Sequence, residues 1–522
     1  MPEQTFPGVF VEELPSGPHP IEGVPTSTAA FIGETERGRL SPVLVQSYAE
    51  YQRFFGGTFS HGRYMPHSVS GFFENGGRRL FVCRVVGQYA TTASKDYGDF
   101  IVEAIGPGAW GRRIWVKIEE GSTRNPNGPD GFRLSLAYWS DAHKAVDTFD
   151  PFEPANRDRL PRPQQIEEYD DLSVDSADPN FFEKVLTHRV TGLPISSLAM
   201  IRRIRGVNTR PPLEPAGGFL SQNGIDDPGP LGADDYAGAT SGGRQQAQGL
   251  LALEGDPFRE VALVHAPRPI ANADPINMAV INHCERLQFR FAVIDADAAT
   301  APGDLDPHNS LVDTKHAAFY APWIVALEPG GAARVQVPPG GHVLGVYARV
   351  DMERGVFKAP ANELIRGALD VAFEVDDRIY DDMAARGVNA IRRFPGGIRV
   401  WGARTLSHDA TWKYVPVRRL LIFLERSIVE GMQWVVFEPN DDRLWGRVKD
   451  TIRLFLRAQW RAGALAGQKE DEAFRVAADR TTMTEEDVLS GRLIVDIGVA
   501  PIRPAEFVVV RIVMRTGEAG SR

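Results

Sequence analysis

The chain has 522 residues, which is too long for one compact domain and predicts two or three. Its formal net charge of -10 argues against a role in coating nucleic acid, because such proteins need a basic surface. Cys83 and Cys284 are its only cysteines, which excludes a disulfide framework and a four-thiolate zinc site. Both are therefore expected to be free thiols in a reducing compartment.

The start of the chain, MPEQTFPGVFVEELPSG, lacks the basic segment and the apolar run of a signal peptide. No apolar run reaches the ~20 residues that a membrane helix needs. We therefore expect synthesis in the cytosol and no direct insertion into a membrane.

Residues 1–93 predict an extended arm followed by alternating strands and helices. The arm, residues 1–25, is rich in proline, which disfavours a packed element. The strands are expected at 28–33, 42–45 and 78–86. Of the two short helices between them, the first is expected to be capped by Ser47 and to end at Gly56, and the second to begin near Pro66. This alternation is typical of an α/β layer.

Residues 94–255 predict a β-rich domain with long polar loops. Stretches rich in proline and aspartate, such as PFEPANRDRLPRPQQ, indicate the loops. The strands are expected at 100–105, 114–119 and 132–138. Because α/β character lies on both sides of this region, we interpret it as an inserted domain.

The α/β pattern resumes after residue 255 as a βαβ unit. Its elements are expected at 261–265 (strand), 275–286 (helix) and 289–294 (strand). Asp274 is the expected N-cap of the helix. A further strand is expected over residues 317–327.

The C-terminal third contains the two clearest helices, at 417–430 and 442–464. The second is amphipathic. Its apolar face is formed by Trp445, Val448, Ile452, Phe455, Leu456 and Trp460. The basic residues, mostly on the other face, are Arg443, Arg447, Lys449, Arg453, Arg457 and Arg461. Such a face is usually just solvated, but a stripe of one sign on an acidic protein also suits docking on an acidic partner.

Catalytic and cofactor motifs are either missing or better explained as structure. Gly106–Gly111 fits G-x-G-x-x-G, yet the RRIWVKIEE that follows alternates like a strand, so a turn between two strands is expected. The sequence contains no phosphate loop, H-E-x-x-H helix or G-x-S-x-G elbow. The acidic run from Asp295 to Asp306 does not fit a calcium loop. We therefore expect no catalytic residue, no cofactor and no metal site.

Both ends of the chain are suited to pairing with another chain. The segment EFVVVRIVM is rich in β-branched residues, and little sequence follows it with which it could pair. An open strand edge invites a second chain, and the extended N-terminal arm is a matching donor. Pairing of both ends within one chain remains the alternative. The expected strand-exchange residues are Val9, Phe10, Val11, Phe507, Val508, Val509, Val510, Arg511, Ile512 and Val513.

Several longer segments share one resemblance. They are PGVFVEELPSGPHPIEGVPTSTAAFIG and FFENGGRRLFVCRVV in the first part, FYAPWIVALEP, VPPGGHVLGVYARVDMERGVFKAPAN and GVNAIRRFPGGIRVWGARTL in the middle, and QWVVFEPNDDRLW, DRTTMT and GRLIVDIGVAPIRPAEFVVVRI near the end. These segments resemble the contractile tail sheath family of myophages, R-type bacteriocins and contractile injection systems. The likeness covers nearly the whole chain and is weakest between about residues 95 and 255.

The resemblance implies a structural protein and not an enzyme. Sheath subunits stack as hexameric rings around an inner tube and contract, which drives the tube through a target envelope. The implied partners are further copies of the chain, the inner tube protein, and baseplate and terminal cap proteins, with no nucleic acid. Assembly is expected in the bacterial cytoplasm, in a phage tail or tail-like particle that stays there or is released. The expected tube contacts are Lys449, Arg453 and Arg457.

The implied fold is a multidomain α/β and α+β protein whose α/β sheath core is split by the β-rich insertion. The expected segments are an N-terminal arm (1–25), the first part of the sheath core (26–93), the inserted outward-facing domain (94–255), the α/β part of the core (256–385), a tube-facing C-terminal domain (386–505) and a C-terminal strand arm (506–522).

Two other classes of protein are alternatives to the sheath. A soluble hydrolase with an α/β core needs a nucleophile and a base, which the sequence does not supply as a recognisable pair. An adhesin-like protein would use the variable region at 95–255 to recognise a ligand, and that role is compatible with a sheath.

Overall fold

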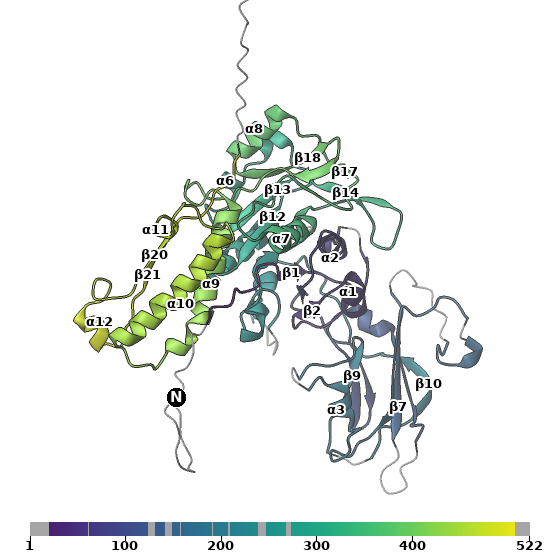
Figure 1. Ribbon diagram of the computed structural model, residues 1–522. Helices are drawn as coiled ribbons and strands as arrows, with labels where there is room; N and C mark the ends of the chain where they lie inside the picture. The colour runs from purple at the N-terminus through teal and green to yellow at the C-terminus, as the bar shows by residue number, and fades with distance from the viewer. Residues whose placement is uncertain are drawn as a thin grey trace, which may run out of the picture. The chain divides into compact units, whose positions relative to one another are not determined.

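The computed structural model describes residues 20–60, 62–123, 131–140, 149–156, 158–189, 192–206, 209–238, 247–267 and 273–506. The chain forms two compact units. One is Pro25–Arg419, and the other combines Met1–Val24 with Leu420–Arg522. Figure 1 labels many of the elements of both.

The unit Pro25–Arg419 is built on a nine-stranded sheet of order β16-β19-β18-β13-β12-β11-β1-β3-β2. The strands are β1 (Ala29–Gly33), β2 (Val43–Val45), β3 (Leu80–Arg84), β11 (Leu263–His265), β12 (Phe291–Asp295), β13 (Ala317–Ala321), β16 (Glu363–Leu364), β18 (Val388–Phe394) and β19 (Gly397–Val400). The run from β18 to β3 pairs in parallel, whereas β2, β19 and β16 pair antiparallel at the edges. Every residue of β1, β3, β12 and β13 is buried, as is usual where helices cover both faces of a parallel sheet.

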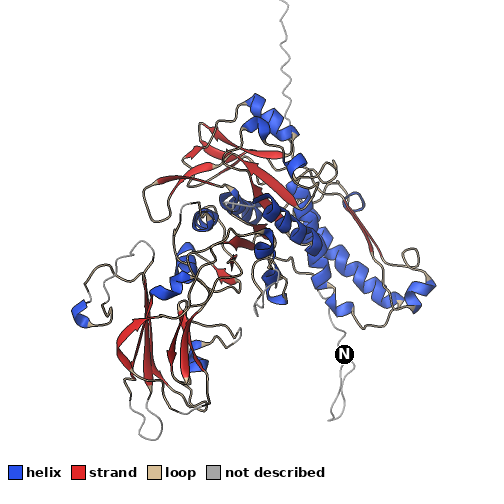
Figure 2. Ribbon diagram, turned by 180° about the vertical axis from the view of Figure 1, so that it is seen from behind, coloured by secondary structure: helices blue, strands red, loops and turns tan. Residues whose placement is uncertain are grey.

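Helices pack on both faces of this sheet (Figure 2). The helices of this unit are α1 (Tyr48–Phe55), α2 (Met65–Glu74), α3 (Phe182–Leu186), α4 (Ala233–Ala237), α5 (Ala273–Leu287), α6 (Pro307–Ser310), α7 (Gly340–Arg354) and α8 (Asp377–Ala385). Phe31 of β1 meets Phe72 of α2, with ring centroids 5.5 Å apart. Its neighbour Ile32 lies in the core cluster that contains Ile276 and Val280 of α5. Because side chains alternate along a strand, α2 and α5 lie on opposite faces.

The helices α2 and α7 approach each other closely because glycines line their contact. A Cβ on Gly71 would lie 2.3 Å from the ring of His342, and one on Gly341 would lie 2.4 Å from the carbonyl oxygen of Ser68. A Cβ on Gly345 would lie 2.5 Å from the carbonyl oxygen of Phe72. Only residues without a Cβ permit this separation.

A β-rich region, residues 94–219, forms two antiparallel sheets with a shared apolar core. One contains β4 (Ser94–Tyr97), β5 (Phe100–Ala104) and β9 (Ala199–Arg203), and the other β6 (Ile114–Glu120), β7 (Phe132–Tyr138), β8 (Gln165–Leu172) and β10 (Glu214–Phe219). The strands expected at 100–105, 114–119 and 132–138 are confirmed. The motif Gly106–Gly111 lies between β5 and β6, as the sequence predicts, and its second half belongs to a 3-10 turn, Ala109–Arg113.

Two sequence expectations are wrong in this unit. Helix α5 begins at Ala273, so Asp274 lies in its first turn, where its charge still suits the helix dipole, and is not the N-cap. The strand expected over 317–327 is broken at Pro322, which has no N–H for a ladder. Only β13 belongs to the large sheet, and β14 (Ile324–Leu327) pairs instead with β15 (Arg334–Val337) and β17 (Asp370–Val371).

The second unit contains most of α9 (Val415–Gly431), whose first residues belong to the other unit. The remaining elements are α10 (Asp442–Arg461), α11 (Glu470–Ala473), α12 (Glu485–Leu489) and the antiparallel pair β20 (Phe474–Ala477) and β21 (Asp496–Val499). Val24 also belongs here, and its N–H donates to the Ser427 hydroxyl at 3.1 Å.

The observed division of the chain differs from the expected segments at one point. The hairpin β18–β19 lies in the nine-stranded sheet, although residues 386–505 were expected to form one C-terminal domain. The second unit begins at Leu420. The other segment limits, and the outward or tube-facing orientation of each segment, stay predictions.

Within the described part of the chain, no helix combines the length and apolar character needed to cross a membrane.

Candidate functional site

The amphipathic helix α10 is the most distinctive surface element of the second unit. The Asp441 side chain caps it by accepting a hydrogen bond from the Leu444 N–H at 2.8 Å. Trp445 donates to the Asn440 side-chain oxygen at 2.7 Å, which fixes the start of the buried face. That face consists of Leu444, Trp445, Val448, Thr451, Ile452, Phe455 and Leu456. The helical period thus turns the basic residues outward, as the sequence predicts.

The three residues expected to contact the tube, Lys449, Arg453 and Arg457, are called here the α10 triplet. The structure brings Arg453 and Arg457 together on one carboxylate, that of Glu470 in α11. Arg453 Nε lies 2.5 Å from Glu470 Oε1, and Arg457 Nε lies 2.7 Å from Glu470 Oε2. Hydrogen bonds from Arg457 and then Arg453 lower the pKa of Glu470 to about 2. Two positive charges therefore face one negative charge, and Arg453, Arg457 and Glu470 together keep a net positive charge.

The other basic residues of α10 differ in their partners. Arg447 pairs with Glu438, with an Nη2 to Oε2 distance of 3.0 Å, and lies over the Trp434 ring. A hydrogen bond from the Thr481 hydroxyl is the main cause of the lowered pKa of Asp479, and the positive charge of Lys449 also contributes. Arg443 and Arg461 are exposed, and neither makes an ion pair with any residue that the structure describes. The basic residues of α10 together keep an excess of positive charge, although Glu438 and Glu470 pair with some of them.

The pair β20–β21, which precedes the C-terminal segment in the sequence, presents strand edges. Each of the two strands has a partner on one side only within residues 273–506. All four residues of β21 are at least partly exposed. The expected strand-exchange residues, 9–11 and 507–513, lie outside the described residues. Strand exchange therefore stays a prediction, and β20 and β21 each have one strand edge that is unpaired within residues 273–506.

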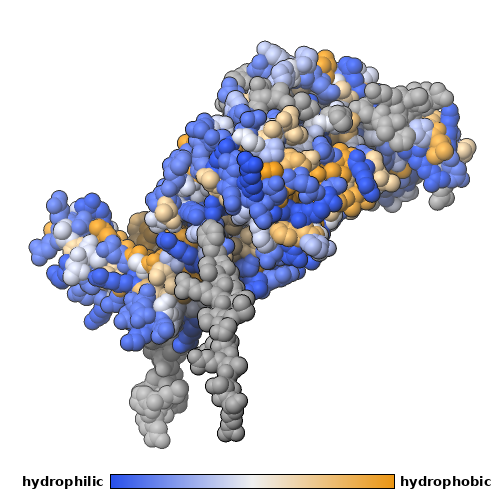
Figure 3. All heavy atoms as spheres, turned by 90° about the horizontal axis from the view of Figure 1, so that it is seen from above, coloured by the Kyte–Doolittle hydropathy of each residue, from blue (hydrophilic) through white to orange (hydrophobic). Residues whose placement is uncertain are grey.

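Exposed apolar side chains in this unit were missed by the sequence reasoning. Phe437 is 102% exposed, Leu489 88% and Val436 59%. Phe437 also has a φ of 71°, a conformation that costs a side-chain-bearing residue energy. The signal in the sequence was the apolar run WVVF placed just before a Pro-Asn turn. Figure 3 shows one face of the molecule, mostly hydrophilic with separate apolar patches.

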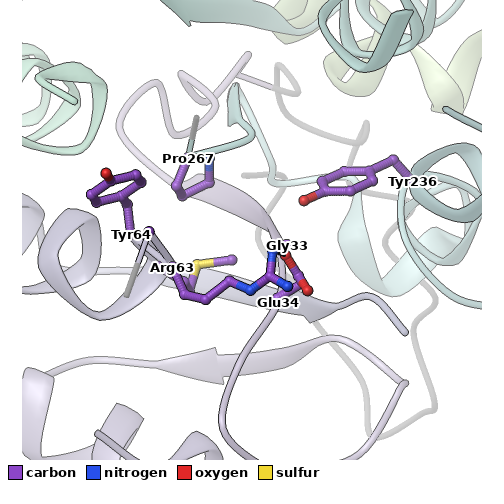
Figure 4. A pocket seen from close by; sticks show the side chains of 8 residues that line it. Gly33, Glu34, Arg63, Tyr64, Tyr236 and Pro267 are labelled. Atoms are coloured by element: carbon purple, nitrogen blue, oxygen red, sulfur yellow. Dashed lines mark ion pairs between the residues drawn. The ribbon is translucent and has the colours of Figure 1, made fainter. Parts of the chain in front are cut away.

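Two hollows of the unit Pro25–Arg419 differ in size. One is lined by Gly33, Glu34, Gly62, Arg63, Tyr64, Met65, Tyr236 and Pro267. In Figure 4 the guanidinium of Arg63 reaches toward Glu34, with which it forms an ion pair. The remaining volume of about 10 Å³ is that of a single water site.

A wider, open hollow of about 650 Å³ lies along α5 and is lined by Ala237, Leu250, Glu254, Ala279, Asn282, His283, Glu285 and Arg286. Glu254 is paired there with Arg286. Burial raises the pKa of the neighbouring Cys284 thiol to about 12, so this cysteine is a poor nucleophile. Among the residues with described positions, no three His, Cys, Asp or Glu side chains are arranged to hold a metal ion.

Comparison with known protein families gives matches over more than half of the chain. Residues 239–406 match the family model of the phage tail sheath protein central domain, and residues 407–515 match that of the phage tail sheath C-terminal domain. A prophage major tail sheath protein of Pseudomonas aeruginosa is 27% identical over 182 residues, which are 34% of this chain and 45% of that protein. The aligned part thus spans less than half the length of this relative.

Solved structures of similar fold cover the chain almost completely. The sheath complex of an extracellular contractile injection system, PVC, in its contracted state has a TM-score of 0.59 at 23% identity and covers 99% of both chains. A chain of the anti-feeding prophage baseplate has a TM-score of 0.56 at 21% identity, covering 98% of this chain and 100% of that one. At these identities the likeness establishes the fold.

Proposed function

The chain belongs to the phage tail sheath family, and we propose that it is a structural subunit that polymerises as stacked hexameric rings around an inner tube and contracts to drive the tube through a target envelope. The observation that carries this proposal is the pair of family matches over residues 239–515. The fold shared over almost the whole length with a contracted sheath supports it. Family membership places the chain among structural proteins.

The proposed partners are further copies of the chain, the inner tube protein, and baseplate and terminal cap proteins. The likeness to a chain of the anti-feeding prophage baseplate supports an association with a baseplate. We place assembly in the bacterial cytoplasm, as part of a phage tail or tail-like particle.

Strand exchange through the termini is the proposed way in which subunits stay connected. The segment that follows β21 contains Phe507–Val513, which is rich in β-branched residues. The open edges of β20 and β21 support the proposal, because an unpaired edge is a template for a strand from another chain.

The α10 triplet is the proposed contact with the tube. Its net positive charge, after the pairing with Glu470, suits an acidic surface. An acidic tube surface would compete with Glu470 for the two arginines, so docking exchanges one carboxylate partner for another.

The energy for contraction is proposed to be stored during assembly. The sequence contains no nucleotide-binding motif. Extended and contracted lattices are then two packings of the same subunit, with contraction downhill. Contraction of purified particles that depends on ATP would contradict this part of the proposal.

Expression of the chain alone tests the main proposal. We expect tubes or long polymers in negative-stain electron micrographs. A chain with both termini intact that stays monomeric at high concentration would refute the sheath function.

A further inference from the structure

A buried ion pair joins three separate parts of the unit Pro25–Arg419. Arg419, near the start of α9, holds Asp351 of α7 through two contacts, Nη2 to Oδ2 at 2.5 Å and Nη1 to Oδ1 at 2.9 Å. The two side chains are 4% and 2% exposed. The third part is the segment before β1, where the Thr26 hydroxyl donates to Asp351 Oδ2 at 2.7 Å. We call Thr26, Asp351 and Arg419 the Asp351 anchor.

The polar atoms of the anchor satisfy one another. Arg419 Nη2 also donates to the carbonyl oxygen of Thr26 at 3.0 Å. The guanidinium lies 4.9 Å from the ring centre of Tyr347, whose hydroxyl is 2.6 Å from that of Tyr320 in β13. The network therefore ties the segment before β1 and the start of α9 to α7 and to the large sheet. In the sequence, Asp351 is 68 residues from Arg419 and 325 residues from Thr26.

Two residues of the anchor lie next to the limits of the unit Pro25–Arg419 in the sequence. The unit limits fall between Val24 and Pro25 and between Arg419 and Leu420. Thr26 and Arg419 are thus within two residues of the two crossing points, and they are bonded to each other. A buried ion pair often adds little to stability compared with apolar residues of the same size, whereas in some proteins buried polar groups specify one arrangement of the chain. Its place in the chain therefore matters more than its contribution to stability.

We propose that the Asp351 anchor fastens both chain crossings to the core at one point, so that the N-terminal segment and α9 are held or released together. Its role in contraction rests on the proposed sheath function. A pulling force on the N-terminal arm would then be transmitted through Thr26 to the buried carboxylate of Asp351 and from there to α7. The segment before β1 would therefore stay attached to the core. Thr26, Asp351 and Arg419 act as positioning residues in this device.

Hydrogen exchange of the purified full chain, followed by mass spectrometry, tests the anchor. The variant Asp351→Asn keeps the size of the side chain and removes the charge that holds Arg419. We expect exchange in the segments 20–28 and 415–424 to rise together by at least about tenfold, a change equivalent to about 1.4 kcal/mol. Exchange in β12 and β13 should stay unchanged.

A second buried pair supplies the matched control. Lys117 Nζ lies 2.8 Å from Asp150 Oδ2, with 7% and 16% of the side chains exposed. Asp150→Asn therefore also removes a carboxylate from a buried cation, which keeps Glu119 as a second partner at 3.0 Å, and it should leave both segments unchanged. Thr26→Val removes one hydrogen bond and keeps the ion pair, so exchange should rise in 20–28 and not in 415–424.

Three results would overturn the anchor. These are a rise in only one segment in Asp351→Asn, an equal rise throughout the unit, or the same rise in Asp150→Asn. The measurement needs no polymer, so its outcome is independent of the sheath function. Tube formation by the same variants, seen by negative-stain microscopy, reports on that function separately.

Discussion

The substitution Gly345→Ala tests the close contact between α2 and α7. The new Cβ would lie 2.5 Å from the Phe72 carbonyl oxygen and 2.6 Å from the Asn75 Cβ, and both atoms belong to or adjoin the backbone of α2. Ordinary contacts of this kind are about 3.5–4.0 Å. The two helices must therefore separate by roughly 1 Å, and the change cannot be absorbed by rotating a flexible side chain.

The size of the effect follows from two opposing terms. Overpacking a core lowers the free energy of unfolding by about 1–3 kcal/mol. Replacing glycine by alanine inside a helix raises it by about 1 kcal/mol. Because rigid atoms meet the new methyl group, the packing term should lie at the upper end of its range. We expect Gly345→Ala to lower the free energy of unfolding by about 2 kcal/mol.

Urea unfolding of the two alanine variants is the assay, with Gly446→Ala as the control. Gly446 lies inside α10, and a Cβ there would meet no atom within 4 Å. The helix term then acts alone, so the control should be as stable as the native chain or more stable by up to about 1 kcal/mol. A Gly345→Ala protein with native stability would refute the packing argument, as would an equal loss in Gly446→Ala.

Three further predictions concern the charges and the ends of the chain. Changing the α10 triplet to glutamate should impair assembly around the tube while the circular dichroism spectrum stays native, and an unchanged yield of tube-filled sheaths would contradict the proposed contact. Deleting residues 507–522 should leave a folded chain that no longer polymerises, and long polymers from this variant would argue against strand exchange. Burial lowers the pKa of His265 and of His342 to about 4, so the unfolded chain binds protons between pH ~6.5 and about 4 that the folded chain does not. Stability should therefore fall as the pH falls through this window, and equal urea midpoints at pH 7 and pH 5 would contradict the neutral burial of these rings.

Local signals in the sequence determined many single elements. Ser47 caps α1 by accepting a hydrogen bond from the Glu50 N–H, as expected from its place before a helical run. The apolar period of α10 predicted its buried face, because a helix presents the same face every 3.6 residues. The quoted segments likewise identified the family, since they extend over nearly the whole chain.

Contacts between distant residues were decided only by the tertiary structure. Pro322 marks the break between β13 and β14, but the sheet that β14 joins depends on partners from residues 334–337 and 370–371. The charge of the α10 triplet depends on Glu470, which belongs to a different helix. A period reports which face of a helix is polar, but not which group lies opposite that face.

The Asp351 anchor shows the same limit most clearly. Thr26, Asp351 and Arg419 are ordinary polar residues in the sequence, and no local spacing relates them. Their contacts form because the fold brings the segment before β1, the end of α7 and the start of α9 to one buried point. Sequence thus determined the elements and the family, whereas the long-range packing decided which residues meet at the Asp351 anchor, because such contacts leave no trace in a local pattern.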